Sequence, residues 1–137
     1  MSYLLDTNIL SEIRKGSRCD ARVKRWWTQV NEADLYLSVM VMGEIRRGIE
    51  KIRIRNPEKA RELDKWVQSV GKAFGPRLLA VELNVAEVWG SMTVKRNLPL
   101  VEGLLTATAI ANDLTLVTRN TKDIEGTGAR YLNPFEA

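Results

Sequence analysis

Short apolar runs alternate along this chain with longer segments in which apolar residues recur every three or four positions. The short runs are typical of buried strands, and the longer segments of amphipathic helices. Strands are expected at residues 3–5, 35–38, 78–81, 114–117 and 130–132. Because strands separated by helices form a parallel sheet covered on both faces, the pattern predicts a three-layer α/β/α fold.

The helical segments have clear breaks between them. Helices are expected at residues 8–15, 20–31, 39–54, from 57 into the 71–76 region, at 85–96 and at 101–112. In the helix at 39–54, Ile45, Ile49 and Ile52 form an i, i+4, i+7 stripe that we expect to face the core. No repeat, linker or low-complexity segment interrupts the pattern, so residues 1–137 are expected to form one domain.

Acidic residues stand where several of these segments end or bend. Asp6 follows the first strand and Asp123 follows the fourth, while Glu44 lies in the helix at 39–54. Glu102 lies in the first turn of its helix, where the positive end of the helix dipole favours an anion. Ligands of an open parallel sheet bind beyond the carboxyl ends of its strands, so we expect these four carboxylates to converge there.

Each carboxylate also has a simpler interpretation. Asp6 could cap the helix that follows it, and Asp123 could stabilise a turn. Glu44 could pair with Arg47, and Glu102 could be a helix-terminal charge without a ligand. Four converging carboxylates would repel one another without bound cations, so joint placement favours a metal site.

The residue types that are missing restrict the chemistry. The chain has no histidine and a single cysteine, Cys19. This excludes a Ser-His-Asp triad, a histidine general base, histidine-ligated zinc and a cysteine-rich metal site. Clustered carboxylates instead indicate Mg²⁺, or alternatively Mn²⁺, as the cofactor. Thr118 and Asn120 follow the fourth strand, and we expect them to orient water, phosphate or the metal ligands.

Composition is that of a folded domain, with 45% hydrophobic and 28% charged residues. The start of the chain lacks the basic region of a signal peptide, no apolar run could span a bilayer, and one cysteine cannot form an internal disulfide. We therefore expect a cytoplasmic protein with no membrane association.

The net charge is +4, and much of the excess lies in one stretch. Its basic residues are opposed only by Glu50 and Glu58. They are Arg46, Arg47, Lys51, Arg53, Arg55, Lys59 and Arg61. Two interpretations stay open at this point: a solvated helix face, or a footprint that binds phosphates.

Several short motifs follow one another along nearly the whole chain. They are Leu4-Leu5-Asp6-Thr7-Asn8, Leu37-Ser38 with Gly43-Glu44-Ile45 and Gly48, Ala107-Thr108-Ala109, residues 116–123, and Leu132-Asn133-Pro134-Phe135. Together, and in this order, these motifs resemble PIN-domain ribonucleases, and in particular the toxins of VapBC-type toxin–antitoxin pairs. The resemblance implies a PIN fold, a metal-dependent endoribonuclease that acts on RNA, a toxin homodimer or toxin–antitoxin hetero-oligomer, and inhibition by a cognate VapB-type antitoxin.

The resemblance also implies a place for the antitoxin, in a groove between the helices at 8–31 and 39–54. Trp26, Trp27 and Trp66 are candidates for apolar contact with a partner, although all three could belong to the core.

One residue departs from the family pattern, which usually has aspartate where this chain has Glu102. The extra methylene displaces the carboxylate by about 1 Å, and active sites tolerate such a displacement poorly.

Two rival hypotheses stand beside the endoribonuclease. One is a PIN-like module that binds RNA but cuts it little or not at all. The other is a metal-dependent phosphatase with Asp6 as nucleophile, which is weakened because Asn8 stands where a second aspartate is needed.

Overall fold

Five parallel strands form the centre of the protein, in a computed structural model that describes residues 1–136. The order in the sheet is β3-β2-β1-β4-β5. The strands are β1 (Tyr3–Leu5), β2 (Leu35–Ser38), β3 (Leu78–Leu79), β4 (Thr115–Val117) and β5 (Arg130–Leu132). All five expected strands are present, and β3 is two residues shorter than expected.

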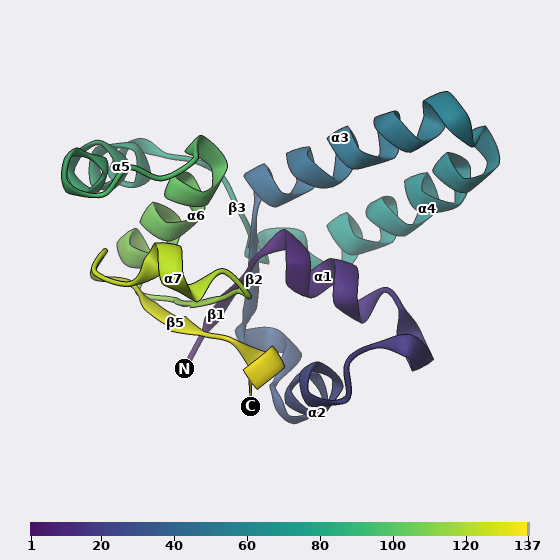
Figure 1. Cartoon of the computed structure of the whole chain (residues 1–137), viewed down its shortest axis with the longest axis horizontal. Coiled ribbons are helices and arrows are strands. Elements are labelled where there is room, and N and C mark those ends of the chain that lie inside the picture. Colours follow the sequence, from purple (N-terminus) through teal and green to yellow (C-terminus); the bar gives the residue numbers. More distant parts are fainter. Residues whose placement is uncertain (137) are drawn as a thin grey trace.

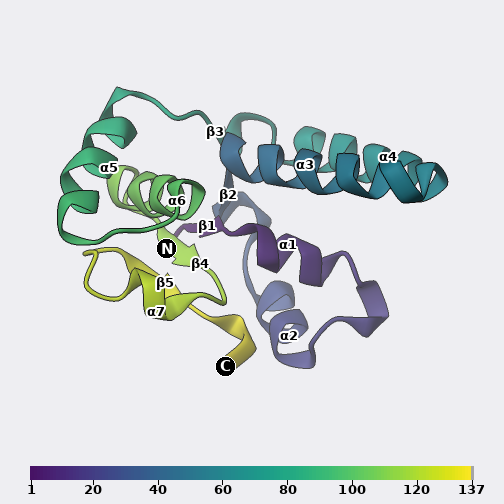
Figure 2. The ribbon, with the colours of Figure 1, turned by 45° about the horizontal axis from the view of Figure 1, so that its top comes forward.

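Helices cover both faces of this sheet, as the α/β/α prediction requires. They are α1 (Thr7–Ile13), α2 (Ala21–Gln29), α3 (Val39–Arg55), α4 (Pro57–Phe74), α5 (Leu83–Lys95), α6 (Leu100–Ala111) and α7 (Thr121–Ile124). In Figure 1, α1–α4 lie on one side of the strands and α5–α7 on the other. Figure 2 shows the same separation after a turn of the molecule. The six expected helices are confirmed to within a few residues, whereas the four-residue α7 was not expected.

The core lies on both faces of the central strands. Leu4, Leu5, Leu37 and Val117 are completely buried, as the apolar runs predicted. Strands enclosed by helices on both faces are apolar throughout, which is why these runs do not alternate with polar residues. Within residues 1–136, no helix is long and apolar enough to cross a membrane.

Helices α3 and α4 run side by side as an antiparallel arm that projects from one end of the sheet (Figure 1). Asp64 of α4 braces the arm, because one of its carboxylate oxygens accepts hydrogen bonds from Arg46 and Arg53 of α3, each at 2.7 Å. The expected core stripe on α3 is confirmed for Ile45 and Ile49. It is wrong for Ile52, which is 36% exposed in the last turn of α3.

At the other end of the molecule, α5 packs closely on α6. Gly103 of α6 makes this approach possible, since a Cβ atom placed there would lie 3.1 Å from Nε1 of Trp89. Because α6 carries Glu102 next to this contact, the fit between the two helices also determines where that carboxylate lies.

We predict that Gly103→Ala lowers the free energy of unfolding by about 1–3 kcal/mol, because the methyl group forces α5 away from α6. Gly90→Ala in α5 is the matched control. A Cβ there meets no atom within 4 Å, and alanine is the better helix former, so stability should be unchanged or higher. Chemical denaturation of both variants measures the difference, and equal stability of the two would contradict the proposed close contact.

Candidate functional site

The candidate site begins where β1 and β4 end together. Leu5 pairs with Val117 in the sheet, and the backbone N–H of Asp6 donates to the carbonyl oxygen of Val117 at 2.9 Å. From this point β2 and β3 lie to one side and β5 to the other. Such a reversal of strand order opens a crevice beyond the strand ends, which is the usual ligand site of α/β sheets.

Asp6 is held firmly at this crevice, with 8% of its surface exposed. Its Oδ1 accepts a hydrogen bond from the backbone N–H of Thr7 at 2.7 Å, and its Oδ2 accepts from Oγ1 of Thr118 at 2.8 Å and from Nδ2 of Asn8 at 3.3 Å. Burial raises the pKa of Asp6, and the nearby carboxylate of Glu44 raises it further, although these hydrogen bonds oppose the shift. Asp6 also caps α1, so the simpler interpretation is compatible with the site.

Glu44 reaches the same crevice from α3. Its Oε1 accepts a hydrogen bond from Oγ1 of Thr7 at 2.6 Å. Within residues 1–136 it forms no ion pair with Arg47, so the structure does not support that alternative. Thr7, the first residue of α1, therefore links the segment that carries Asp6 to α3, which carries Glu44.

Glu102 lies in the first turn of α6, and its Oε1 is buried without a hydrogen-bond partner among the described residues. Burial, followed by the neighbouring carboxylates of Asp123, Asp6 and Glu44, raises the pKa of Glu102 to about 7. The other three expected carboxylates are thus close enough to act on Glu102. A buried carboxylate oxygen without a partner is costly, so a proton or a cation is needed there.

Asp123 is exposed in the first turn of α7 and lies close enough to Glu102 to raise the pKa of that carboxyl. Arg96, at the end of α5, holds this turn in place. Its guanidinium donates to the carbonyl oxygens of Lys122 at 2.7 Å and of Asp123 at 3.3 Å. The position of Asp123 therefore depends on a cation that the sequence pattern did not single out.

Two further residues hold the segments of the site together, and neither was expected to be a site residue. Thr7 binds Glu44, and the side chain of Asn8 both donates to Asp6 and accepts from the backbone N–H of Arg119, at 3.3 Å each. Their position directly after a buried strand was the available signal. Of the expected supporting residues, Thr118 contacts Asp6, whereas Asn120 contributes its backbone N–H, which donates to Oγ1 of Thr118 at 3.1 Å.

The donor set fits a hard divalent cation, because every side chain that converges offers oxygen and one buried oxygen lacks a partner. In residues 1–136, however, no three acidic or cysteine side chains lie in an arrangement that already fits a metal ion. The carboxylates would therefore have to move closer together when an ion binds.

Comparison with known proteins gives consistent matches over the whole chain. The family described as "PIN domain" matches residues 3–127. The chain is 28% identical to toxin FitB of Neisseria gonorrhoeae, with 96% of this chain and 97% of that protein covered. It is 26% identical to VapC ribonuclease Y4jK of Sinorhizobium fredii, with 97% of each covered.

Solved structures share the same fold. The structure of FitAcB from Neisseria gonorrhoeae matches with a TM-score of 0.88 and 28% identity, covering 98% of this chain and 99% of that one. A toxin–antitoxin complex from Klebsiella pneumoniae matches with a TM-score of 0.74 at 24% identity, covering 97% and 98% of the two chains, which shows the fold alone.

The raised pKa of Glu102 predicts how stability depends on pH in the metal-free protein. The folded state binds the proton of the Glu102 carboxyl more tightly than the unfolded state does. The contribution of this proton to the free energy of unfolding is therefore complete below pH 4.5 and is lost as pH rises towards about 7. In EDTA at pH 8, Glu102→Gln should therefore raise the melting temperature by about 2–4 °C relative to the unchanged protein. This gain should shrink at pH 5.

The control is Glu87→Gln, which removes an exposed carboxylate from α5. It should shift the melting temperature equally at both pH values. A gain for Glu102→Gln that is the same at pH 5 and pH 8 would show that ionisation of the buried Glu102 carboxyl is not the cause.

Proposed function

Because this chain belongs to the PIN domain family, we propose that it is the toxin of a toxin–antitoxin pair and an endoribonuclease that depends on Mg²⁺. The buried, unpartnered Oε1 of Glu102 beside three other carboxylates is the observation that carries the metal dependence. The similarity to a protein named VapC ribonuclease supports RNA as the substrate.

Asp6, Glu44, Glu102 and Asp123 are the residues that would hold the metal. Bound there, Mg²⁺ or Mn²⁺ supplies charge neutralisation at a phosphodiester and a water molecule of lowered pKa. The chain supplies no histidine for this task, so the carboxylates are its own titratable groups near the crevice. Glu102, with a pKa of about 7, is a group that must release a proton before it can bind the cation.

The neighbouring polar side chains keep two of these carboxylates in place. Thr118 and Asn8 together direct Oδ2 of Asp6, and the backbone N–H of Thr7 directs Oδ1. The hydroxyl of Thr7 does the same for Glu44. Side chains whose orientation is set before the substrate arrives lose less entropy when the reacting groups are brought together.

A specific observation favours a second candidate, an RNA-binding module that cuts poorly. Glu102 is longer than the aspartate usual in the family, and the described carboxylates are not yet arranged for metal binding. A ligand displaced by about 1 Å is enough to reduce the rate substantially. The two candidates differ only in rate, so one substitution at Glu102 separates them.

For the antitoxin, the structure offers an apolar groove between α1, α2 and α4. Residues that line it include Leu10, Ile13, Trp27, Trp66 and Phe74. Trp26 instead packs against Tyr3, with the rings perpendicular and their centroids 5.3 Å apart. We propose that a helix or an extended segment of the antitoxin occupies this groove, because such grooves bind apolar faces of partner segments. The apolar side chains that line it support this placement. It differs from the expected groove between the helices at 8–31 and 39–54, because α4 rather than α3 forms its second wall.

We predict that Asp6→Asn lowers RNA cleavage by about a hundredfold or more, because it removes a charge that the cation requires. The melting temperature should be equal or higher, since the substitution also removes carboxylate repulsion. The control is Asp113→Asn, which removes an exposed carboxylate that pairs with Arg130 outside the site. Cleavage that persists in EDTA, with contamination excluded, would refute the metal dependence, and unfolding of Asp6→Asn would favour the capping role alone.

The second substitution tests the length of Glu102. Glu102→Asp should raise the cleavage rate at fixed Mg²⁺, or lower the Mg²⁺ concentration needed, because the shorter side chain restores the ligand position usual in the family. Rates are measured over a Mg²⁺ titration beside Glu102→Ala. If both variants cleave like the unchanged protein, Glu102 is only a helix-terminal charge.

A further inference from the structure

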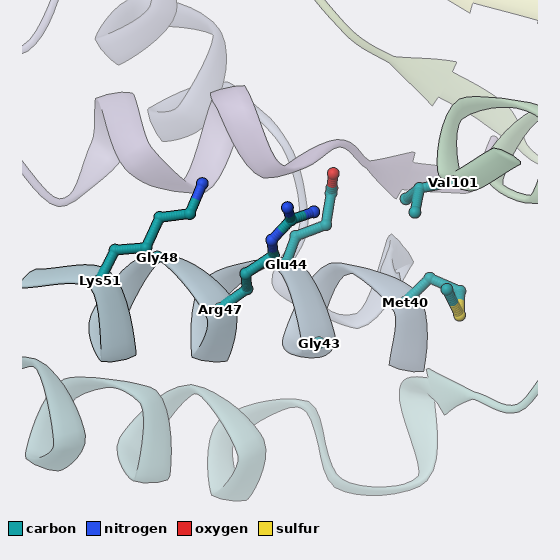
Figure 3. Close-up of a pocket in the computed structure, with 7 residues that line it drawn as sticks. All are labelled: Met40, Gly43, Glu44, Arg47, Gly48, Lys51 and Val101. Carbon is teal, nitrogen blue, oxygen red and sulfur yellow. The ribbon is translucent and has the colours of Figure 1, made fainter. Parts of the chain in front are cut away.

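A groove of about 410 Å³ runs along α3 and starts at the candidate site. Figure 3 shows the side chains of Glu44, Arg47 and Lys51 rising from the same side of this helix, with Val101 of α6 near the end where Glu44 lies. Glu44 therefore belongs both to the carboxylate cluster and to the start of the groove. The groove is a route by which a long substrate could leave the site.

Four of the five positive charges of α3 divide into two groups, and the fifth, Arg55, is the last residue of the helix and does not line the groove. Arg46 and Arg53 are paired with Glu50 and Asp64, at 2.7–3.1 Å, and hold the arm together. Arg47 and Lys51 are exposed and form no ion pair within residues 1–136. Only the second group lines the groove, so its charges are available to a ligand.

Two glycines form part of the groove, and packing within the chain does not require either of them. Gly43 and Gly48 lie inside α3, where glycine is less favourable than alanine. A Cβ atom at either position would meet no other atom within 4 Å, in contrast to the crowded position of Gly103. An open surface beside the two cations explains these residues, because it lets a nucleic-acid backbone approach the helix closely.

The spacing of the two cations suits a chain of phosphates. Arg47 and Lys51 follow Glu44 by three and seven residues, which places them about 4.5 Å and 10.5 Å further along the helix axis. They therefore lie in line, leading away from the carboxylates on one face of α3. Guanidinium and ammonium groups on flexible stems are the usual ligands of phosphate oxygens.

We propose that Arg47 and Lys51 bind two phosphates of single-stranded RNA to one side of the cleaved bond, over a surface kept open by Gly43 and Gly48. The inference rests on the proposed function for the identity of the ligand. It assigns the phosphate footprint to two residues of the basic stretch and gives Arg46 and Arg53 a structural role.

The test measures binding of a fluorescently labelled single-stranded RNA oligonucleotide in EDTA, by anisotropy, so that no cleavage is required. Arg47→Ala with Lys51→Ala should raise the Kd about tenfold or more. It should also reduce the slope of log K against log salt by about 0.7 for each phosphate that the protein no longer neutralises. The matched control, Arg55→Ala with Lys59→Ala, removes the same charge from exposed positions outside the groove and should change the Kd by less than about threefold.

A second pair of variants tests the groove without changing charge. Gly48→Gln should raise the Kd while leaving the melting temperature equal or higher, because the new side chain starts in the groove and its Cβ meets no atom within 4 Å. Gly90→Gln in α5 should leave the Kd unchanged.

Equal binding by the two double variants would overturn the inference, as would an unchanged protein that does not bind the RNA. Displacement of the RNA by poly-glutamate of equal charge would also overturn it, by assigning the groove to an acidic protein. A protein that binds the RNA through Arg47 and Lys51 but does not cut it with Mg²⁺ would refute the proposed function alone.

Discussion

Burial of Asp6 and Glu102 close to other carboxylates, beyond the ends of β1 and β4, is the constraint on which this structure depends. Backbone pairing of Leu5 with Val117 brings the first two segments of the site together, and three further elements then add a negative charge each. The side-chain donors to Asp6 are neutral hydroxyl and amide groups, and a backbone N–H donates as well. These hydrogen bonds hold the carboxylate in place without neutralising its charge. The arrangement is electrostatically unfavourable in the absence of a cation, and its oxygen donors fit a divalent one.

Much of the fold could be predicted from the sequence because its strands are short, apolar and buried on both faces. Runs such as Tyr3–Leu5 and Thr115–Val117 would be unfavourable at the surface, so burial was the expected outcome. The helices between them have apolar residues at regular spacing. The missed helix, α7, has only four residues, fewer than the repeat that apolar spacing needs. Ile52 was misassigned because periodicity defines a helix face but not where along the helix burial ends.

The candidate site was predictable in its charges but not in their surroundings. Asp6 and Asp123 follow strands, so the carboxyl edge of the sheet was a sound expectation for both. The contacts of Thr7 with Glu44 and of Arg96 with the α7 backbone join residues 37 and 26–27 positions apart, and local patterns carry no information about such pairs. The basic stretch was ambiguous for the same reason, since only the position of Asp64 on α4 separates the arginines that brace the arm from the cations that line the groove.

The order of residues in the two surfaces has a consequence for synthesis of the chain. Every residue that lines the apolar groove lies between Leu10 and Phe74, whereas the carboxylate cluster is incomplete until Asp123 has been added. Synthesis proceeds at about 5–20 residues per second, so the groove residues leave the ribosome some seconds before the last carboxylate. A nascent chain therefore carries the residues of the groove that we propose for the antitoxin before it carries the full set of carboxylates. An antitoxin that binds this groove would have its first opportunity to do so during translation.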